Sequence, residues 1–468
     1  MNSFSAVVTT GIYCLPSCQA QPQARHVRRY PLAAAAEAAG YRACFRCRPY
    51  RTQPSVHLPA PALVCRAVQI ILDGALDGQT EGDLAAHLGY SARHLRRLFV
   101  EHLGVTPDQL ARSARTHFAR RLLDDTDFTI TEVASAAGFG SIRQLNRACR
   151  EVFWETPVRL RDRRRASDRL VTDGGLALRL PYQAPLDWDA PLAYLRRRAI
   201  PGVEQVSGRT YRRTVCIAGD PGVIELAPGG PADVVLRAHL PHWEGLTHLA
   251  QRARRVFNLD GDIGGAAAHL AADPLVGPLL RARPGLRPPG TWAPLEVGVW
   301  AIAAHEGGPA TANAIAARMV ERYGTAVAGL RDWGLTHLFP SARTLATADL
   351  GDVGLSRSGS ATINAFAQAV ADHAVHLDHA GGLETLTRSL TTVPGVGAGV
   401  ADYLAWRMGE PDAWPGPAAA AAAWAARRPL AGEGAERWRP WRAYAAMQLL
   451  VATACGGEPD APCYGERP

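Results

Sequence analysis

Residues 14–47 read CLPSCQAQPQARHVRRYPLAAAAEAAGYRACFRC and contain two closely spaced pairs of cysteines. The spacing, C-x3-C and then C-x2-C, can close a tetrahedral Zn²⁺ site with Zn–S bonds of about 2.3 Å. So short a module has little apolar core, and a bound metal would take the place of one. A set of four reduced structural thiols is the alternative. We expect one structural, thiolate-activating Zn²⁺ with four ligands, Cys14, Cys18, Cys44 and Cys47.

The flanking sequences TTGIYC and AAGYRACFRCRP resemble the N-terminal domain of Ada-type DNA alkylation-response proteins. The resemblance covers residues 1–52 and implies that the first cysteine, here Cys14, accepts a methyl group from a DNA methylphosphotriester. Zinc would keep the attacking thiolate deprotonated. Methyl transfer would remove one negative charge and raise the affinity for the DNA backbone. Each molecule would react once, as a stoichiometric self-methylating methyltransferase. Three neighbouring residues are expected to contact DNA, namely Thr10, Arg46 and Arg48.

Three features depart from that family. Leu15 stands where the family usually has Arg, the segment QAQPQARHVRRY (residues 19–30) is expected to be irregular, and fewer residues than usual precede TTGIYC. We therefore expect a shortened or misassigned start, with zinc binding retained. The second methyl-acceptor domain of the Ada family acts on guanine O6 and carries a Pro-Cys-His-Arg motif. This sequence lacks that motif, so O6-methylguanine repair is not predicted.

The charge of the chain is unevenly distributed. Residues 1–170 contain 24 arginines and 15 carboxylates, and the remainder contains 27 and 28, so the whole positive excess lies in the first third. A localised basic excess indicates a nucleic-acid surface, and the expected partner is double-stranded DNA, both backbone-methylated and at promoter sites. The sequence shows no signal peptide and no membrane-spanning apolar run, and its nine cysteines fit a reducing compartment. We expect a cytoplasmic, nucleoid-associated bacterial protein with no membrane partner.

An internal repeat follows the zinc module. LAAHLGYSARHLRRLFVEHLGVTP (residues 84–107) recurs as VASAAGFGSIRQLNRACREVFWETP (residues 133–157). Each copy predicts a short helix, a glycine-containing turn and a longer arginine-bearing helix, which is a helix-turn-helix pattern. Two such copies resemble the AraC-type DNA-binding domain, here assigned to residues 62–165. A plain helical bundle with a solvated arginine face is the alternative.

The resemblance implies that the second helix of each copy enters a major groove. These recognition helices are expected to begin near Ser91 and Ser141. The sequence leaves open which side chains would touch bases and which would touch phosphates. The candidates for DNA contact are Ser91, Arg93, Arg97, Ser141 and Arg143.

Residues 175–242 predict a small α+β domain, because short apolar runs alternate with turn residues there. Residues 243–455 are almost entirely helical in pattern, and residues 456–468 form a tail. Within the α+β domain a helix is expected at about 189–198, and strands at about 176–181, 211–218, 221–227 and 233–238.

Pro394-Gly395-Val396-Gly397 lies between two predicted helices, which is a helix-hairpin-helix pattern. Gly395 and Gly397 would let backbone N–H groups approach a DNA phosphate. Together with PYQAPLDWDAPLAYLRRRAIPGVE, GLRPPGTWAPLEVGVWAI and WRPWRAYA, this order resembles 3-methyladenine DNA glycosylases of the AlkA type. The resemblance implies that an alkylated base is flipped out of the duplex and that a carboxylate stabilises the cationic sugar as the base leaves.

The sequence departs from the glycosylase family where the chemistry lies. The position of the catalytic Asp, three residues after a Phe-Pro-like pair, is Ala418. The Trp that the family usually has shortly after the hairpin glycines aligns with Val400, and the base-pocket aromatic near the C-terminus aligns with Leu450. The apolar wedge that fills the gap left by the flipped base aligns with Glu306. A carboxylate inside a base stack is unfavourable. The alignment therefore predicts a glycosylase fold that has lost base excision.

The predicted fold class is a multidomain, mainly α protein with a four-cysteine zinc module, a double helix-turn-helix, an AlkA-like N-terminal α+β domain and a helix-hairpin-helix glycosylase fold. The predicted function is that of a monomeric transcriptional regulator of the DNA-alkylation response, with RNA polymerase as a candidate protein partner. Two alternatives stay open. The chain could be a bifunctional regulator and active 3-methyladenine glycosylase in base excision repair. It could also be an architectural DNA binder whose zinc module never takes up a methyl group.

Overall fold

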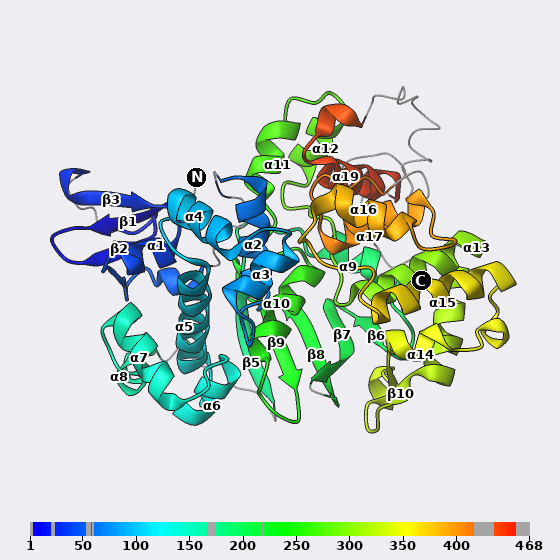
Figure 1. Cartoon of the computed structure of the whole chain (residues 1–468), viewed down its shortest axis with the longest axis horizontal. Coiled ribbons are helices and arrows are strands. Elements are labelled where there is room, and N and C mark those ends of the chain that lie inside the picture. The colour runs from blue at the N-terminus through cyan, green and yellow to red at the C-terminus, as the bar shows by residue number, and fades with distance from the viewer. Residues whose placement is uncertain are drawn as a thin grey trace. The chain divides into compact units, whose positions relative to one another are not determined.

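The computed structural model contains two compact units (Figure 1). The first unit comprises Met1–Tyr182 and Asp233–Arg252, and the second comprises Gln183–Ala232 and Ala253–Pro468. The strands of the predicted α+β domain belong partly to the first unit and partly to the second. The predicted domain boundaries remain a prediction. The structure describes residues 3–19, 24–52, 58, 60–165, 168, 170, 175–217, 219–415 and 435–454.

The zinc module, residues 3–52 of the first unit, contains a small four-stranded sheet. Its strands are β1 (Phe4–Val7), β2 (Ile12–Cys14), β3 (Val27–Tyr30) and β4 (Arg42–Ala43), in the order β3-β1-β2-β4. β1 pairs antiparallel with β2 and β3, whereas β2 pairs parallel with β4. The expectation of an irregular segment before Pro31 is therefore wrong for its last four residues. They form the edge strand β3. Their sequence, VRRY, has no alternation of apolar and polar residues, and backbone pairing with β1 holds the strand in place.

One face of this sheet is buried. Paired residues on neighbouring strands share a face, and Ala6, Tyr13 and Ala43, which pair across three strands, are fully buried. Helix α1 (Ala33–Ala38) contacts β1, β3 and β4 and contributes four buried alanines, whose small side chains let the helix approach the sheet closely. The opposite face carries Cys14.

Helices α2 to α8 form the paired helix-turn-helix of the first unit. The two recognition helices begin where predicted, because the hydroxyls of Ser91 and Ser141 accept hydrogen bonds from backbone N–H groups three residues on, at 3.3 and 3.2 Å. Gly89 and Gly138 in the two turns have φ angles of +80° and +76°, which favour glycine. The helices are α2 (Ala62–Leu72), α3 (Glu81–His87), α4 (Ala92–Leu103), α5 (Pro107–Asp125), α6 (Ile130–Ala136), α7 (Ile142–Phe153) and α8 (Pro157–Asp162).

Helix α5 is the centre of the first unit. It contacts α1, α2, α6, α7, α8 and the 3-10 turn Pro49–Arg51, and Figure 1 shows it lying among them. Thr106 starts the helix with a capping box that includes Gln109. The C-terminal half of α5 buries charged side chains, including Arg120 and Asp124, and these need partners from other elements.

Short antiparallel ladders occur in both units. β5 (Leu176–Pro181) pairs with β9 (Asp233–His239) in the first unit. β6 (Glu204–Ser207), β7 (Thr210–Ile217) and β8 (Asp220–Pro228) form a meander in the second. The four predicted strands and helix α9 (Asp189–Arg196) are confirmed. β6 was not predicted, because its sequence EQVS is short and lacks an apolar alternation.

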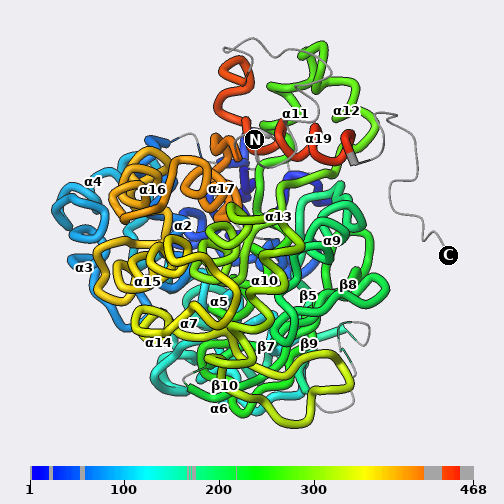
Figure 2. The backbone as a smooth tube through the Cα atoms, turned by 90° about the vertical axis from the view of Figure 1, so that its right-hand side faces the viewer, coloured from blue at the N-terminus to red at the C-terminus, as the bar shows by residue number. Residues whose placement is uncertain are grey.

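The remaining elements of the chain are mainly helical, as predicted. They are α10 (Leu246–Val256), α11 (Ile263–Leu270), α12 (Val276–Ala282), α13 (Pro294–Tyr323), β10 (Thr325–Ala326), β11 (His337–Leu338), α14 (Ala342–Ala346), α15 (Arg357–Ala371), α16 (Gly382–Thr391), α17 (Ala398–Met408) and α19 (Arg442–Ala454). α13 packs against α15 and α17 (Figure 2) and breaks at Gly307 and Gly308. Within the described ranges, no helix combines the length and the apolar character that crossing a membrane requires.

Candidate zinc centre and DNA-interaction sites

The four cysteines of the zinc module converge at one place. Cys14 ends β2, Cys44 directly follows β4, and Cys18 and Cys47 lie in the turns just beyond. Their sulfur atoms all lie within 4.8 Å of one another. Tetrahedral Zn–S bonds of about 2.3 Å would place the sulfurs about 3.8 Å apart, so the set fits a zinc ion. The predicted Zn²⁺ ligand set is therefore brought together as expected.

The negative charge of the thiols is unevenly shared. Hydrogen bonding from Cys14 lowers the pKa of Cys47 to about 5, and the same contact together with burial raises the pKa of Cys14. The backbone N–H of Leu15 also donates to the Cys47 sulfur, at 3.4 Å. A divalent cation stabilises thiolates and offsets their mutual repulsion. Bound zinc would therefore hold Cys14, whose side chain is mostly buried, in the reactive thiolate form.

The residue that precedes Cys14 connects the zinc module to α5. Tyr13 is fully buried, and its hydroxyl donates a hydrogen bond to Glu37 Oε1 at 2.5 Å. The same oxygen lies 2.6 Å from His117 Nε2 of α5. Burial alone would raise the pKa of Glu37, but the His117 contact outweighs it and lowers this pKa. An ionised carboxylate therefore lies between the backbone next to Cys14 and the central helix of the unit.

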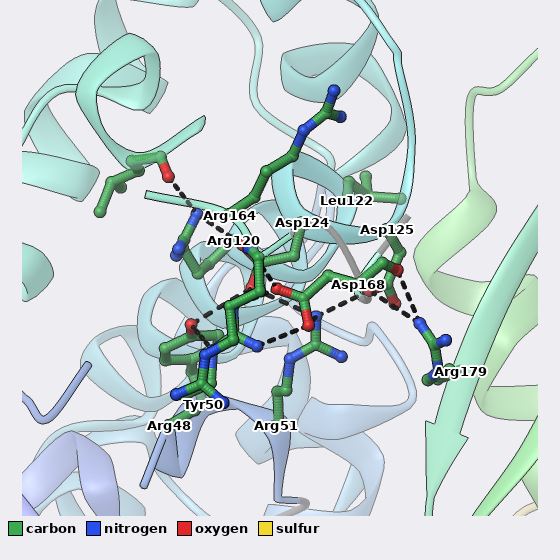
Figure 3. A network of polar contacts seen from close by, with 12 residues as sticks. Arg48, Tyr50, Arg51, Arg120, Leu122, Asp124, Asp125, Arg164, Asp168 and Arg179 are labelled. Carbon is green, nitrogen blue, oxygen red and sulfur yellow. Dashed lines mark hydrogen bonds and ion pairs between the residues drawn. The ribbon is translucent and has the colours of Figure 1, made fainter. Parts of the chain in front are cut away.

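A second network joins the end of the zinc module to α5 (Figure 3). Arg48 donates to both carboxylate oxygens of Asp168, at 2.7 and 2.6 Å, and to Asp124 Oδ2 at 3.1 Å. Arg51 donates to Asp125 Oδ1 at 2.7 Å. Arg48 is only 7% exposed, so its guanidinium group reaches a DNA phosphate only if these bonds break. Its partners lie 76 and 120 residues away in the sequence, and no local pattern indicates them.

The other two DNA contacts predicted in the zinc module are exposed. Thr10 lies in the turn between β1 and β2. Arg46 lies between Cys44 and Cys47, and its guanidinium group makes one hydrogen bond of 3.4 Å, to Gln19 Oε1. Both side chains are placed where a DNA backbone could reach them.

Four of the predicted contacts of the helix-turn-helix pair lie at the exposed starts of α4 and α7, and the fifth, Arg97, lies one turn further along α4. Arg93 and Arg143 occupy the same second position of the two helices, and neither forms an ion pair with a described residue. Arg97 lies 3.6 Å from Glu101 in an exposed pair one helical turn apart, which contributes little to stability. The two capping serines are exposed beside these arginines.

The helix-hairpin-helix turn connects α16 to α17 in the second unit. Gly395 has a φ of +86°, and a Cβ at this position would lie 1.9 Å from Thr362 Oγ1. Val393 and Val396 are buried and anchor the turn. Gly397 is the N-cap residue of α17. The two predicted glycines therefore lie on an exposed turn that leads into a helix N-terminus, an arrangement that suits a phosphate.

Among the positions where the sequence departs from the glycosylase family, two are buried in the core and one is hydrogen-bonded at a helix break. Val400 and Leu450 are buried in the core of the second unit. Glu306 lies at the break of α13, and its carboxylate accepts hydrogen bonds from the Ser356 N–H, at 3.0 Å, and from the Ser356 hydroxyl. Ala418 and the predicted tail lie outside the described residues.

Asp402 of α17 is a carboxylate that was not among the predicted site residues. It is half-buried, and burial raises its pKa against the opposing charge of Arg442. No hydrogen bond to its carboxylate occurs among the described residues. In the sequence, Asp402 could have been found as the first acidic residue after the hairpin glycines.

The cysteine cluster and the fold define a DNA-binding zinc protein that combines paired helix-turn-helix motifs with a glycosylase-like unit. Family models match the chain in three places. The metal binding domain of Ada matches residues 2–50, a helix-turn-helix domain matches residues 84–163, and the AlkA N-terminal domain matches residues 177–293.

A "probable bifunctional transcriptional activator/DNA repair enzyme AlkA" of Mycobacterium tuberculosis is 37% identical over 455 residues, which cover 95% of this chain and 91% of that protein. The chain belongs to this family of bifunctional Ada/AlkA proteins. The "DNA-3-methyladenine glycosylase 2" of Escherichia coli is 30% identical over 60% of this chain and 98% of its own length. A solved 3-methyladenine DNA-glycosylase from Archaeoglobus fulgidus matches 58% of this chain and 97% of its own with a TM-score of 0.50. At 17% identity, it supports the fold alone.

Proposed function

We propose that the chain is a transcriptional regulator that senses methylation of the DNA backbone through Cys14. The Cys14 thiolate attacks the methyl carbon of a methylphosphotriester, so that an S–CH₃ bond forms and the C–O bond breaks. The phosphate leaves as a diester anion, and no proton is transferred. The sulfur loses its negative charge, which reduces the repulsion between the cysteine cluster and nearby DNA phosphates.

The observation that carries this proposal is the convergence of four cysteine sulfurs, including that of Cys14, within 4.8 Å in the part of the chain that matches the metal binding domain of Ada. The test is incubation of the zinc-loaded chain with duplex DNA that holds one methylphosphotriester, followed by peptide mass spectrometry. We expect one methyl group on Cys14 and none on the other cysteines, and no uptake by zinc-loaded Cys14→Ser. An unmodified Cys14 in the zinc-loaded protein would contradict the proposal.

We further propose that Arg93 and Arg143 read promoter DNA. Their equivalent positions and lack of ion pairs among the described residues support this role. Arg93→Ala and Arg143→Ala should each weaken promoter binding by about 1–3 kcal/mol and relax specificity at one position. Arg147→Ala is the matched control on α7, because Arg147 is ion-paired with Glu151 at 2.8 Å. An equal loss in all three variants would argue against the assignment.

We also propose that the regulator binds DNA as a nucleoid-associated monomer and contacts RNA polymerase from the promoter. The basic excess of its first third supports association with DNA. Sedimentation of the free chain tests the monomer, and co-retention of RNA polymerase with promoter-bound protein tests the contact.

The second unit, in our proposal, keeps the glycosylase fold and the DNA-facing hairpin but lacks base excision. The burial of Val400 and Leu450 and the hydrogen bonds that Glu306 makes with Ser356 support this proposal, as does the absence of a carboxylate from residues 416–423. A base-release assay on methylated duplex DNA should show no free 3-methyladenine with the native chain and a gain with Ala418→Asp. Release by the native chain would contradict the proposal.

An active glycosylase is the second candidate function, and Asp402 is the observation that favours it. This carboxyl group is half-buried, and no described residue donates a hydrogen bond to it, so it is chemically available to stabilise a cationic sugar. If the native chain releases alkylated bases, Asp402→Asn should abolish release while duplex binding persists. Release that survives this substitution would exclude Asp402.

A further inference from the structure

We propose that Arg29 binds a DNA phosphate close to the methylated one and so positions the phosphotriester at the sulfur of Cys14. The inference rests on the proposed function of Cys14 as methyl acceptor, and it adds a positioning residue to that reaction. Arg29 lies on β3, the edge strand inside a segment whose sequence predicts no regular structure.

The register of the zinc-module sheet places Arg29 on the face that carries Cys14. Ser5 of β1 pairs with Cys14 of β2 on one side and with Arg29 of β3 on the other. Directly opposed residues of antiparallel strands project from the same face of the sheet. Cys14, Ser5 and Arg29 therefore form one row across three strands.

The neighbouring row projects from the other face of the sheet. Tyr13, Ala6 and Arg28 form that row, and Tyr13 and Ala6 are fully buried there. Arg28 and Arg29 are both exposed and carry the same charge on consecutive residues of one strand. They differ in the face they occupy, which makes Arg28 a matched control supplied by the chain itself.

The charge of the zinc module favours a polyanion at this face. Residues 1–52 contain seven arginines and one carboxylate, Glu37, whose buried side chain is paired with His117 of α5. No exposed carboxylate of the module therefore competes with a phosphate for its arginines.

Several of the other arginines of the zinc module already have partners. Arg48 and Arg51 are bound to aspartates, and Arg42 stacks on the rings of Phe45 and Trp154, with its guanidinium carbon 4.9 and 5.6 Å from the ring centroids. Among the described residues, the Arg29 side chain has no hydrogen bond or ion pair.

The spacing suits a contact beside the reacting phosphate. Each step between opposed residues spans about 5 Å, so Arg29 begins about 10 Å from Cys14 along the row. Successive phosphates of one DNA strand rise by about 3.4 Å along the helix axis. A guanidinium group that extends from Arg29 thus meets the DNA backbone within about three nucleotides of the phosphotriester. A charge-assisted hydrogen bond there can fix the position of the DNA strand relative to Cys14.

The test compares Arg29→Gln with Arg28→Gln in the zinc-loaded full chain, on a duplex with a single methylphosphotriester. Single-turnover methylation of Cys14 is measured as a function of DNA and salt concentration. Arg29→Gln should lower the rate at subsaturating DNA about tenfold, lower the rate at saturation as well, and reduce the slope of log affinity against log salt by about one. Arg28→Gln should leave the saturating rate unchanged, and Arg29→Lys should recover part of the loss because it keeps the charge.

Zinc content and the thermal transition of each variant show whether the module stays folded. Equal effects of Arg28→Gln and Arg29→Gln, or no effect of either, would overturn the assignment of Arg29. If the native chain takes up no methyl group at all, the proposed function fails. In that case the salt slope for unmethylated duplex still decides whether Arg29 binds a phosphate.

Discussion

Arg48 and Asp168 form a bidentate ion pair, with N···O distances of 2.7 and 2.6 Å, although 120 residues separate them in the sequence. The pair ties the end of the zinc module to the segment that follows the second helix-turn-helix. Asp124 of α5 accepts a further hydrogen bond from the same guanidinium group at 3.1 Å. The zinc module and the DNA-binding helices are thus joined by charges that are removed from water, where each charge depends strongly on its partners.

The first prediction concerns Asp124, which is fully buried and lies close to Arg48, Arg51 and Arg120. Asp124→Ala should lower the free energy of unfolding by about 3–5 kcal/mol, because it leaves buried guanidinium groups without their counter-charge. The thermal transition of the full chain measures the effect.

Helix α5 contains its own control for this prediction. Arg112 and Asp108 form an ion pair of 2.7 Å with the same one-turn spacing as Arg120 and Asp124, but with both side chains about half exposed. Asp108→Ala should cost about 1 kcal/mol or less. Similar losses in the two variants would show that burial does not decide the strength of these pairs.

The second prediction is a pH dependence that arises from Asp168. Burial alone would raise its pKa, but hydrogen bonds from Arg48 and from the Arg165 amide outweigh burial and lower the pKa to about 2, against about 3.9 in an unfolded chain. Ionised Asp168 therefore contributes stability that is present above about pH 4 and is lost as the pH falls through about 2. Asp168→Asn should be less stable than the native chain at neutral pH.

Urea unfolding of both proteins between about pH 2 and about pH 6 measures this linkage. The difference in the free energy of unfolding should be constant in the upper part of the range and should shrink below about pH 4. A difference that stays constant down to about pH 2 would mean that the ionised carboxylate has no special role.

The third prediction concerns the metal. Cys44→Ser should abolish stoichiometric zinc binding and lower the thermal transition of the first unit, because the module has little other core. Cys216→Ser, which replaces an exposed cysteine of β7, should change neither zinc content nor the transition. Metal analysis and calorimetry test both expectations, and full zinc retention by Cys44→Ser would exclude Cys44 as a required ligand.

The fourth prediction concerns the hairpin of the second unit. Gly395→Ala should destabilise the turn by at least about 1–2 kcal/mol and weaken binding to duplex DNA, because φ is +86° and the new Cβ would meet Thr362. Gly399→Ala lies four residues further on, in α17, with open space around its Cβ. It should stabilise the helix by about 0.5–1 kcal/mol. Equal DNA affinities in the two variants would argue that the hairpin does not contact DNA.

The sequence by itself determined those features that depend on local spacing. The zinc ligands, the two recognition helices with their serine caps, the strands β5, β7, β8 and β9 and the hairpin glycines were all predicted. Each is set by residue type within a few positions, through ligand geometry, capping, alternation or the freedom of glycine at positive φ.

Only the tertiary structure decided which charged side chains are free. Arg48 was expected to contact DNA, but packing against α5 gives it Asp124 and Asp168 as partners. Arg29 lay in a segment that predicted no structure, yet pairing with β1 places it in the row of Cys14. The physical reason is the same in both cases. Strand register and the pairing of buried charges join residues that are distant in the sequence, and only the folded chain brings them together.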